Sequence, residues 1–316
     1  FLGHAATAER GRSPDEYERK RSYPNHEMSL QRRGDDAAPT KRPLLSTLIA
    51  ILSPSARHGD LLAAGHTILI ISAGVTAVMI MLAFGAIGYW LEGAVAAIGG
   101  GLSSAYMVRS SFGRIDTDQL NLGLMYMMFG LVMLSARSKT AMVTLIWAVT
   151  AGATANIFMA WYGKPELIWM AIAAYAWLLA VLRKDLKIAV LCLLLFYALA
   201  PVSLPNPFAS AYVQENFADG GFLFPNTFKT ITEIARISLP EILVSSAGSV
   251  EMGLVCLIGL GLWAIRHPVM AVAYGPLAAF ALLNFVLGNR AVFYSAPILW
   301  FGSGLPCNLR YPLYST

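Results

Sequence analysis

The feature that most constrains this chain is an uninterrupted stretch, Leu61 to Leu91, that contains no Asp, Glu, Lys or Arg. A bilayer core about 30 Å thick is crossed by roughly 20 apolar residues in a helix, so this stretch is long enough to span a membrane. The whole chain of 316 residues is only 13% charged, against about 25% in an ordinary globular protein. This composition excludes a soluble enzyme, a disordered chain and a nucleic-acid-binding protein.

The charged residues are concentrated at the N-terminal end of the chain. Residues 1–43 hold 9 Lys/Arg and 7 Asp/Glu. Within them, Ser13-Pro14-Asp15-Glu16 has the capping Ser, the early Pro and the Glu three residues later that are typical of a helix start. We therefore expect residues 1–60 to be an outer loop with a short amphipathic helix. Residues 61–305 would be a transmembrane domain that includes an outer loop at 203–250, and residues 306–316 an irregular, truncated tail.

Apolar stretches of helical length recur along the rest of the sequence. They predict an all-α, polytopic bundle with about nine spans. The expected spans are Leu61–Leu91, Gly93–Val108, Leu120–Ala136, Ala141–Trp161, Leu167–Leu182, Ile188–Val202, Met252–Ile265, Val269–Leu287 and Ala291–Leu305.

The positions of Lys and Arg predict which way the spans run. Arg137 with Lys139, the Arg183–Lys187 loop and Arg266 occupy alternate loops, and loops rich in Lys and Arg stay on the cytoplasmic side. The segments on the other side, including the Arg109–Asp118 loop and residues 203–250, then face outward. These outer segments hold nearly all the remaining carboxylates.

Three outer stretches contain residues that could carry chemistry. Asp116-Thr-Asp118 pairs two carboxylates at the mouth of a helix, a common way to hold a divalent cation against a phosphate. The long outer loop contains Thr230-Ile-Thr-Glu233. The stretch before the last span reads Gly288-Asn-Arg290-Ala-Val-Phe-Tyr-Ser-Ala-Pro297.

In this order and on this predicted face, the three stretches resemble the catalytic subunit of oligosaccharyltransferase. That family includes the single-subunit bacterial and archaeal enzymes of protein N-glycosylation. The resemblance covers roughly residues 1–305. Its marks are an Arg seven residues before Asp-Thr-Asp, a Thr-Ile-x-Glu and a Gly-x-Arg-x-x-x-Tyr-Ser-x-Pro. It implies a membrane glycosyltransferase (GT-C) fold in the plasma membrane, the inner membrane of a bacterium, with the active site on the periplasmic or extracellular face.

The resemblance also implies an activity. The protein would transfer an oligosaccharide from a polyprenyl-pyrophosphate lipid to the side-chain amide of Asn in Asn-x-Ser/Thr sequences of a polypeptide. Asp116 and Glu233 would be catalytic, and with Asp118 they would hold a divalent cation, Mg²⁺ or Mn²⁺. Arg290, Arg109 and Tyr162 would bind the pyrophosphate of the donor.

The sequence departs from the family in ways that predict a fragment. The family's earliest catalytic Asp stands just before the stretch that begins here at Phe1. Its C-terminal soluble domain, with a Trp-Trp-Asp motif that reads the acceptor, is not matched. We therefore expect residues 1–316 alone to transfer no glycan.

Two other functions fit parts of the sequence. One is another polyprenyl-phosphate-dependent membrane glycosyltransferase, which would use a monophosphate-linked sugar. The other is a transporter or structural membrane protein, which would need a polar pathway through the spans.

Overall fold

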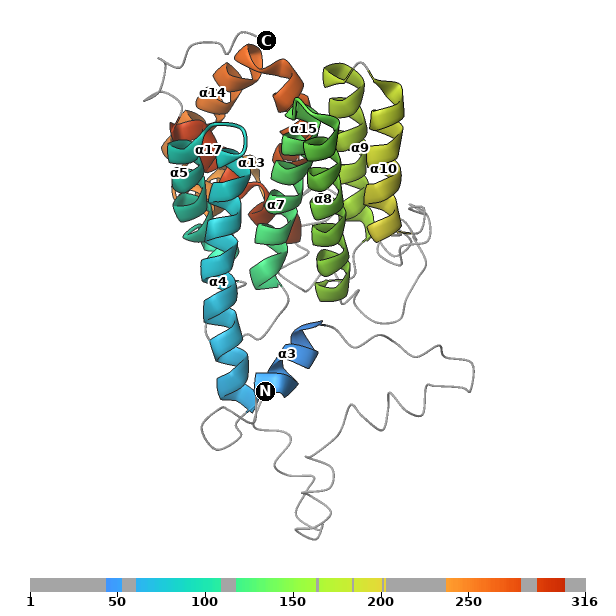
Figure 1. The fold of residues 1–316 in the computed structure, drawn as a ribbon. Coiled ribbons are helices and arrows are strands. Elements are labelled where there is room, and N and C mark those ends of the chain that lie inside the picture. The colour runs from blue at the N-terminus through green and yellow to red at the C-terminus, as the bar shows by residue number, and fades with distance from the viewer. Residues whose placement is uncertain are drawn as a thin grey trace, which may run out of the picture. The chain divides into compact units, whose positions relative to one another are not determined.

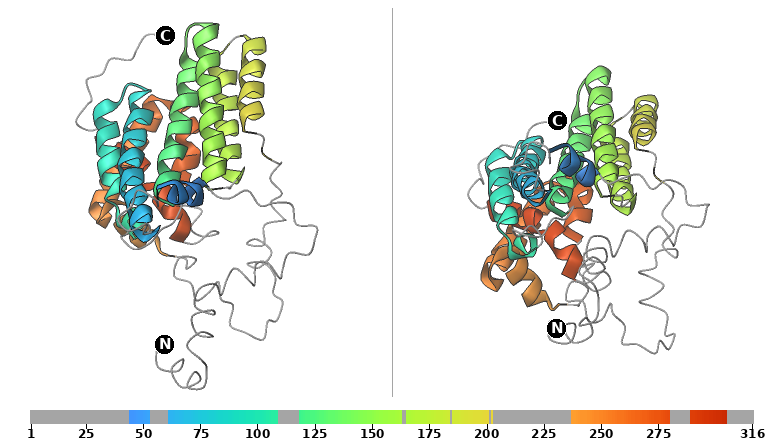
Figure 2. Two further views of the ribbon diagram at one scale, coloured as in Figure 1. Left: turned by 60° about the horizontal axis from the view of Figure 1, so that its bottom comes forward. Right: turned by 90° about the horizontal axis from the view of Figure 1, so that it is seen from below.

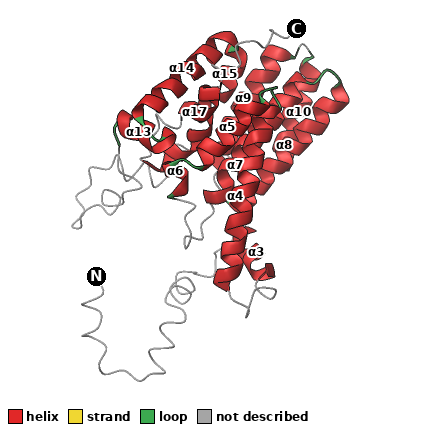
Figure 3. Cartoon of the chain, turned by 90° about the vertical axis from the view of Figure 1, so that its left-hand side faces the viewer, coloured by secondary structure: helices red, strands yellow, loops and turns green. Residues whose placement is uncertain are grey.

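The computed structural model describes residues 44–52, 61–108, 118–162, 165–183, 185–200, 202, 237–279 and 289–304. In these ranges every regular element is a helix (Figure 3). The contacts of the chain separate Phe1–Arg42 from Pro43–Thr316, and all the described residues belong to the second unit. The expected helix at Ser13–Glu16 therefore lies outside the described residues.

The helices follow one another along the chain as Figure 1 shows. They are α3 (Leu44–Leu52), α4 (Leu61–Gly85), α5 (Trp90–Gly101), α6 (Ser104–Met107), α7 (Asp118–Arg137), α8 (Ala141–Trp161), α9 (Pro165–Leu182), α10 (Leu186–Leu199), α13 (Leu239–Ala247), α14 (Val250–Arg266), α15 (Pro268–Ala279), the 3₁₀ helix η3 (Asn289–Tyr294) and α17 (Ala296–Gly304).

Three helices, α4, α7 and α8, are long and apolar enough to cross a membrane. A fourth crossing is formed if α13 and α14, which meet at an angle of 87°, count as one bent span. The α8 helix has the predicted bounds, and α7 begins two residues before its predicted span and ends one residue after it. The structure therefore confirms an all-helical fold with helices suited to a membrane.

Other predicted spans are divided in the structure. The first, Leu61–Leu91, stops being helical at Gly85, and a turn over residues 86–89 follows. Gly88 has a φ of 95° in this turn, a backbone conformation that favours glycine. The second expected span becomes α5, with 12 residues, and the short α6. At 1.5 Å per residue, α5 is about 18 Å long, so it is too short to cross a bilayer as a straight helix.

The α7 helix is the centre of the bundle. In its most apolar window 83% of the residues are buried, and it packs against α4, α8 and α9. Small residues allow α4 and α7 to approach closely, because Gly123 lies against Thr76 and Gly130 against Ala83. Figure 2 shows α4 and α5 on one side of this centre and α8 and α10 on the other.

One end of the bundle is formed by short connections, and we call it the basic end. It consists of residues 86–89, 138–140, 183 and 185, of His267, which joins α14 to α15, and of the helix ends beside them. Hydrogen bonds connect these loops. Arg137 Nη1 donates to the carbonyl oxygen of Ile87 at 3.3 Å, and Tyr89 Oη and His267 Nε2 are hydrogen-bonded at 2.9 Å. The three loops that follow α7, α9 and α14, which the sequence predicts to lie on one side, are therefore found at one end.

Arg183 fastens a further pair of loops at the basic end. Its guanidinium donates to the carbonyl oxygens of Ser135 and Ser138 and to Thr144 Oγ1. This links the loop after α9 to the loop between α7 and α8. The Arg183 guanidinium thus donates to carbonyl oxygens at the C-terminal end of α7, where the last turn of a helix leaves acceptors without partners.

Candidate functional site

The other end of the bundle gathers the elements that carry or adjoin the sequence motifs, and we call it the motif end. It consists of α6, α13, η3 and the first turn of α7. The α13 helix packs against α6, α14, α17 and η3, and α6 also contacts η3. In Figure 3, α13 and α6 lie at the same end of the bundle. Short elements from four parts of the chain therefore meet there.

The first turn of α7 buries three polar side chains. Asp118 is 1% exposed, and Gln119 and Asn121 are fully buried. Asn121 Nδ2 donates to Asp118 Oδ1 at 3.3 Å. The backbone of this turn is also held, because the carbonyl oxygen of Gln119 accepts from Thr76 Oγ1 at 2.6 Å and from Tyr106 Oη at 2.7 Å. Burying polar groups without such bonds costs free energy, so these bonds offset part of the cost of burying this turn.

Tyr106 connects the first turn of α7 to η3. Its hydroxyl binds Gln119, and its ring lies 6.4 Å from the ring of Phe293. The η3 helix is fixed from its other side by Tyr126, whose hydroxyl donates to the carbonyl oxygen of Tyr294 at 2.9 Å and accepts from the backbone N–H of Ile298 at 3.0 Å. The contact of Tyr106 places η3, which contains the backbone of Arg290, beside the start of α7, and that of Tyr126 holds it against the middle of the same helix.

The predicted site residues are described to different extents. Asp118 is buried at the motif end, and the backbone of Arg290 lies in η3. Tyr162 follows the last residue of α8, and its ring packs on Phe158 at 5.9 Å. Since α8 runs antiparallel to α7, Tyr162 belongs to the same end of the bundle as Asp118 (Figure 1). Asp116, Arg109 and Glu233 lie outside the described residues, and so does the side chain of Arg290.

The described residues at the motif end offer oxygen atoms to a cation. No group of three or more His, Cys, Asp or Glu occurs in the described ranges, and two of the three predicted ligands lie outside them. Asn121 Oδ1 is buried and has no hydrogen-bond partner there, and its side chain touches the Asp118 carboxylate. Carboxylate and amide oxygens are the donors that Mg²⁺ and Mn²⁺ prefer, so these residues fit such an ion.

Sequence reasoning did not identify Asn121. The signal for it is its spacing: Asn121 is three residues after Asp118, so the two share one face of the helix. It is also one of few polar residues in an otherwise apolar stretch.

Sequence reasoning also missed α13, which lies within the predicted outer loop 203–250. Its start carries a capping box, because the backbone N–H of Ser238 donates to Glu241 Oε2 at 2.6 Å. Pro240 stands in the first turn. The pattern Ser-Leu-Pro-Glu is visible in the sequence and is the same kind of signal as Ser13-Pro-Asp-Glu16.

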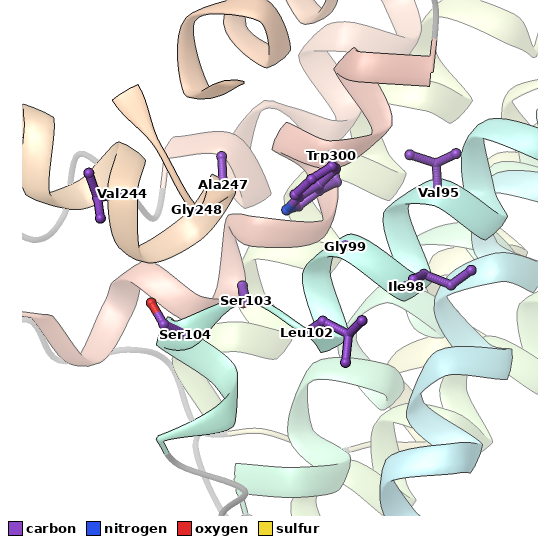
Figure 4. Close-up of a pocket in the computed structure, with 10 residues that line it drawn as sticks. All are labelled: Val95, Ile98, Gly99, Leu102, Ser103, Ser104, Val244, Ala247, Gly248 and Trp300. Atoms are coloured by element: carbon purple, nitrogen blue, oxygen red, sulfur yellow. The ribbon is translucent and has the colours of Figure 1, made fainter. Parts of the chain in front are cut away.

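An apolar groove of about 630 Å³ opens beside the motif end. Figure 4 shows that Trp300 of α17 lies between the walls formed by α5 and α13. Trp300 Nε1 donates to the carbonyl oxygen of Ser246 at 3.0 Å, and Ser104 Oγ donates to that of Ser245 at 3.0 Å. These two bonds attach α13 to α17 and to α6. The lining residues are Val95, Ile98, Gly99, Leu102, Ser103, Ser104, Val244, Ala247, Gly248 and Trp300.

Over the described residues, fold and site together define a helical protein with apolar helices that could cross a membrane and a buried polar cluster at one end. A comparison with known protein families gave no match, and a comparison with curated proteins found none similar to this chain.

Proposed function

We propose that this protein is the catalytic part of an oligosaccharyltransferase. It would move an oligosaccharide from a polyprenyl pyrophosphate to the Asn side chain of an Asn-x-Ser/Thr sequence in a polypeptide. One observation supports this proposal above the others, the packing of α6, α13 and η3 beside the first turn of α7. Asp116 is two residues before α7, Glu233 is five residues before Ser238 at the start of α13, and Arg290 belongs to η3.

Chain connectivity limits how far the motifs are from these elements. A fully extended chain advances at most about 3.6 Å per residue. The Cα atom of Asp116 is therefore within about 7 Å of that of Asp118, and the Cα atom of Glu233 within about 18 Å of that of Ser238. Both limits are compatible with one site at the motif end.

In this site, Asp116, Asp118 and Glu233 would hold Mg²⁺ or Mn²⁺, with Asn121 beside them. A divalent cation supplies positive charge that stabilises the leaving pyrophosphate. Arg290 would bind the same pyrophosphate, with Arg109 and Tyr162 nearby, since a guanidinium pairs with phosphate oxygens through two parallel hydrogen bonds.

The acceptor amide is a poor nucleophile because its nitrogen lone pair is delocalised into the carbonyl group. A carboxylate that accepts hydrogen bonds from the amide NH₂ weakens this delocalisation. Glu233 would have this role. Its carboxylate would act on the acceptor amide only when the site is assembled.

The groove beside the motif end suits the lipid part of the donor. Its walls are apolar, and Ile98 and Leu102 are exposed along it. An isoprenoid chain lying there would leave its pyrophosphate at the level of α6 and η3. This assignment requires the motif end to face the outer side of the membrane and the basic end the cytoplasm, in a bundle of the GT-C type with about nine spans.

Donor binding tests the proposal. We would purify the full chain in detergent and titrate it with a short-chain polyprenyl-pyrophosphate glycan in the presence of Mn²⁺. We expect saturable binding that EDTA removes and that Arg290→Gln and Asp116→Asn each weaken by about tenfold or more. Asp185→Asn is the control, because Asp185 is an exposed carboxylate at the basic end and its loss should leave the affinity unchanged.

Two results would contradict the proposal. One is donor binding that is equal with Mn²⁺ and with EDTA and is unaffected by Arg290→Gln. The other is tighter binding of a polyprenyl monophosphate sugar than of the pyrophosphate glycan, which would favour the rival class of membrane glycosyltransferase.

A further inference from the structure

Two arginines at the basic end belong to one site. Arg137 is the last residue of α7, and its Nη1 donates to the carbonyl oxygen of Ile87 at 3.3 Å. Arg266 is the last residue of α14 and is followed by His267, which is hydrogen-bonded to Tyr89. Ile87 and Tyr89 are two residues apart in the same turn, so their Cα atoms lie within about 7 Å of each other. The site therefore lies between α7, α14 and the turn that joins α4 to α5.

Both arginines are exposed, and neither forms an ion pair with a described residue. Two carboxylates are described at this end. Asp185 caps α10, where it accepts from the backbone N–H groups of Lys187 at 2.9 Å and Ile188 at 3.3 Å. Glu92 is buried within α5, at 1% exposure. The site therefore presents two exposed guanidinium groups that form no ion pair with a described carboxylate.

Exposed apolar residues adjoin both arginines. Ile265, immediately before Arg266, is 79% exposed, and Trp90 and Leu91 follow Tyr89 at 55% and 60% exposure. Tryptophan beside a charged helix end is typical of the interface between a bilayer and water. The arrangement matches a molecule with a charged head and an apolar tail better than it matches a small free anion.

We propose that Arg137 and Arg266 bind the phosphate of an anionic phospholipid in the membrane leaflet that the basic end faces. The two guanidinium groups hold the phosphate through paired hydrogen bonds. Ile265, Trp90 and Leu91 contact the acyl chains. Basic pockets between the ends of membrane helices bind anionic headgroups in this way. The proposal does not depend on the transferase activity.

Native mass spectrometry of the full chain tests this site. The protein would be released from mixed micelles that contain dioleoyl phosphatidylglycerol or dioleoyl phosphatidylcholine, and the retained lipids counted. We expect the chain to retain phosphatidylglycerol with an affinity about tenfold or more above that for phosphatidylcholine. The double variant Arg137→Gln/Arg266→Gln should lose this preference.

A matched control removes the same charge from the same end. Lys139 and Lys187 are exposed at the basic end, and neither is part of the contacts around Tyr89 and His267. The double variant Lys139→Gln/Lys187→Gln should keep most of the preference for phosphatidylglycerol. Arg137→Lys/Arg266→Lys, which keeps the charge but loses the paired donors, should bind with intermediate affinity.

Several outcomes would overturn the proposal. Equal loss in the two Gln variants would show that binding follows overall charge and not this site. Equal retention of the two lipids by the unmodified chain would show that no anionic lipid is selected. Complete displacement of phosphatidylglycerol by millimolar inorganic phosphate would identify a free anion as the ligand. If Arg137→Gln/Arg266→Gln does not fold, the Lys variant and the phosphate competition still decide.

Discussion

The basic end and the motif end of the bundle differ in charge and in how the chain connects its helices. Every Lys and Arg side chain that the structure describes lies at the basic end. At the motif end and in the adjoining first turn of α14 the described charged side chains are the carboxylates Asp118, Glu241 and Glu251. The connections of the basic end have four residues or fewer. At the motif end the longer segments 109–117 and 203–236 separate the described helices, whereas only residues 162–164 separate α8 from α9.

The polar groups at the two ends are also used differently. At the basic end, arginines reach across loops to backbone carbonyl groups, as Arg183 and Arg137 do. At the motif end, side chains such as Asp118 and Asn121 are buried next to each other. Burying such groups is costly in an apolar bundle, and polar residues kept there usually serve a function. We infer that the basic end fixes the orientation of the bundle and that the motif end carries the chemistry.

The largest expected effect concerns the sides of the membrane that the two ends face. Cys192 and Cys256 are buried, so with Cys307→Ser the chain offers a suitable background for single cysteines. In spheroplasts, Ser238→Cys at the motif end should react fully with a membrane-impermeant maleimide. Lys139→Cys at the basic end should react only after permeabilisation. The reverse pattern, or labelling of both from outside, would break the comparison.

The next effect concerns the crossing of α14 and α17. Gly302 of α17 and Gly259 of α14 lie backbone to backbone, and a Cβ atom on either would meet main-chain atoms of the other helix. Gly302→Leu should lower the free energy of unfolding by about 3 kcal/mol or more, through overpacking and backbone displacement. Thermal unfolding in detergent measures this.

Gly261 is the matched control for this crossing. It lies on the same helix as Gly259, and nothing would contact its added Cβ atom within 4 Å. Gly261→Ala should be neutral or stabilising by up to about 1 kcal/mol, because Ala favours a helix more than Gly does. A loss of stability in Gly261→Ala as large as that in Gly302→Leu would show that the backbone contact at this crossing does not cause the loss.

A smaller effect is expected at the motif end. Tyr126→Phe removes the hydroxyl that binds the carbonyl oxygen of Tyr294 and the N–H of Ile298. Both groups are left without this partner in the buried region, which should cost about 1–3 kcal/mol. The loosened η3 should also weaken donor binding. Tyr197→Phe is the control, since its hydroxyl bond to Val202 at 3.2 Å lies on a 44% exposed side chain, and a similar loss there would contradict the prediction.

The smallest effect concerns pH at the basic end. Burial, then the charges of Arg266 and Arg137, lower the pKa of His267 from its ordinary value of 6.5. Tyr89, hydrogen-bonded to His267, is itself near Glu92. Because the folded state disfavours protonation, the unfolded state binds more protons as pH falls through about 6.5. The melting temperature should therefore be highest above this pH and fall slightly below it.

His267→Gln tests this assignment. The variant should lose the decrease between about pH 7 and 5 while it keeps other pH effects. A decrease of the same size in the variant would assign the pH dependence to another group.

The helical class of the fold followed from the sequence, because the length of an apolar stretch predicts a helix that could cross a membrane. Ala141–Trp161 was predicted with its observed bounds, and the loops with Arg137, Arg183 and Arg266 were predicted to share one end. The break after Gly85 was missed because the turn at Gly88 is as apolar as the helices beside it.

The candidate site could be predicted only in part. Asp118 was identified because it forms a pair of carboxylates with Asp116, two residues apart at the mouth of a helix. The contacts of Tyr106 with Gln119 and Phe293 join residues from separate parts of the chain, and no local spacing predicts them. The same holds for the pairing of Tyr89 with His267, which are 178 residues apart. Short-range patterns define helices and caps, whereas the neighbours of a buried hydroxyl depend on how the helices pack.

The contact of Gly259 with Gly302 has a consequence for how this protein can change over evolutionary time. A Cβ atom on Gly259 would meet the backbone of Gly302, and one on Gly302 would meet the backbone of Cys256 and Leu260 in α14. Neither position can accept a larger residue on its own, because the two helices would have to separate. A change at the other position cannot compensate, since the residue there is already glycine. Among homologous sequences that keep this helix packing, both positions should therefore remain glycine together. Gly261, where an added Cβ atom would meet nothing within 4 Å, should vary freely.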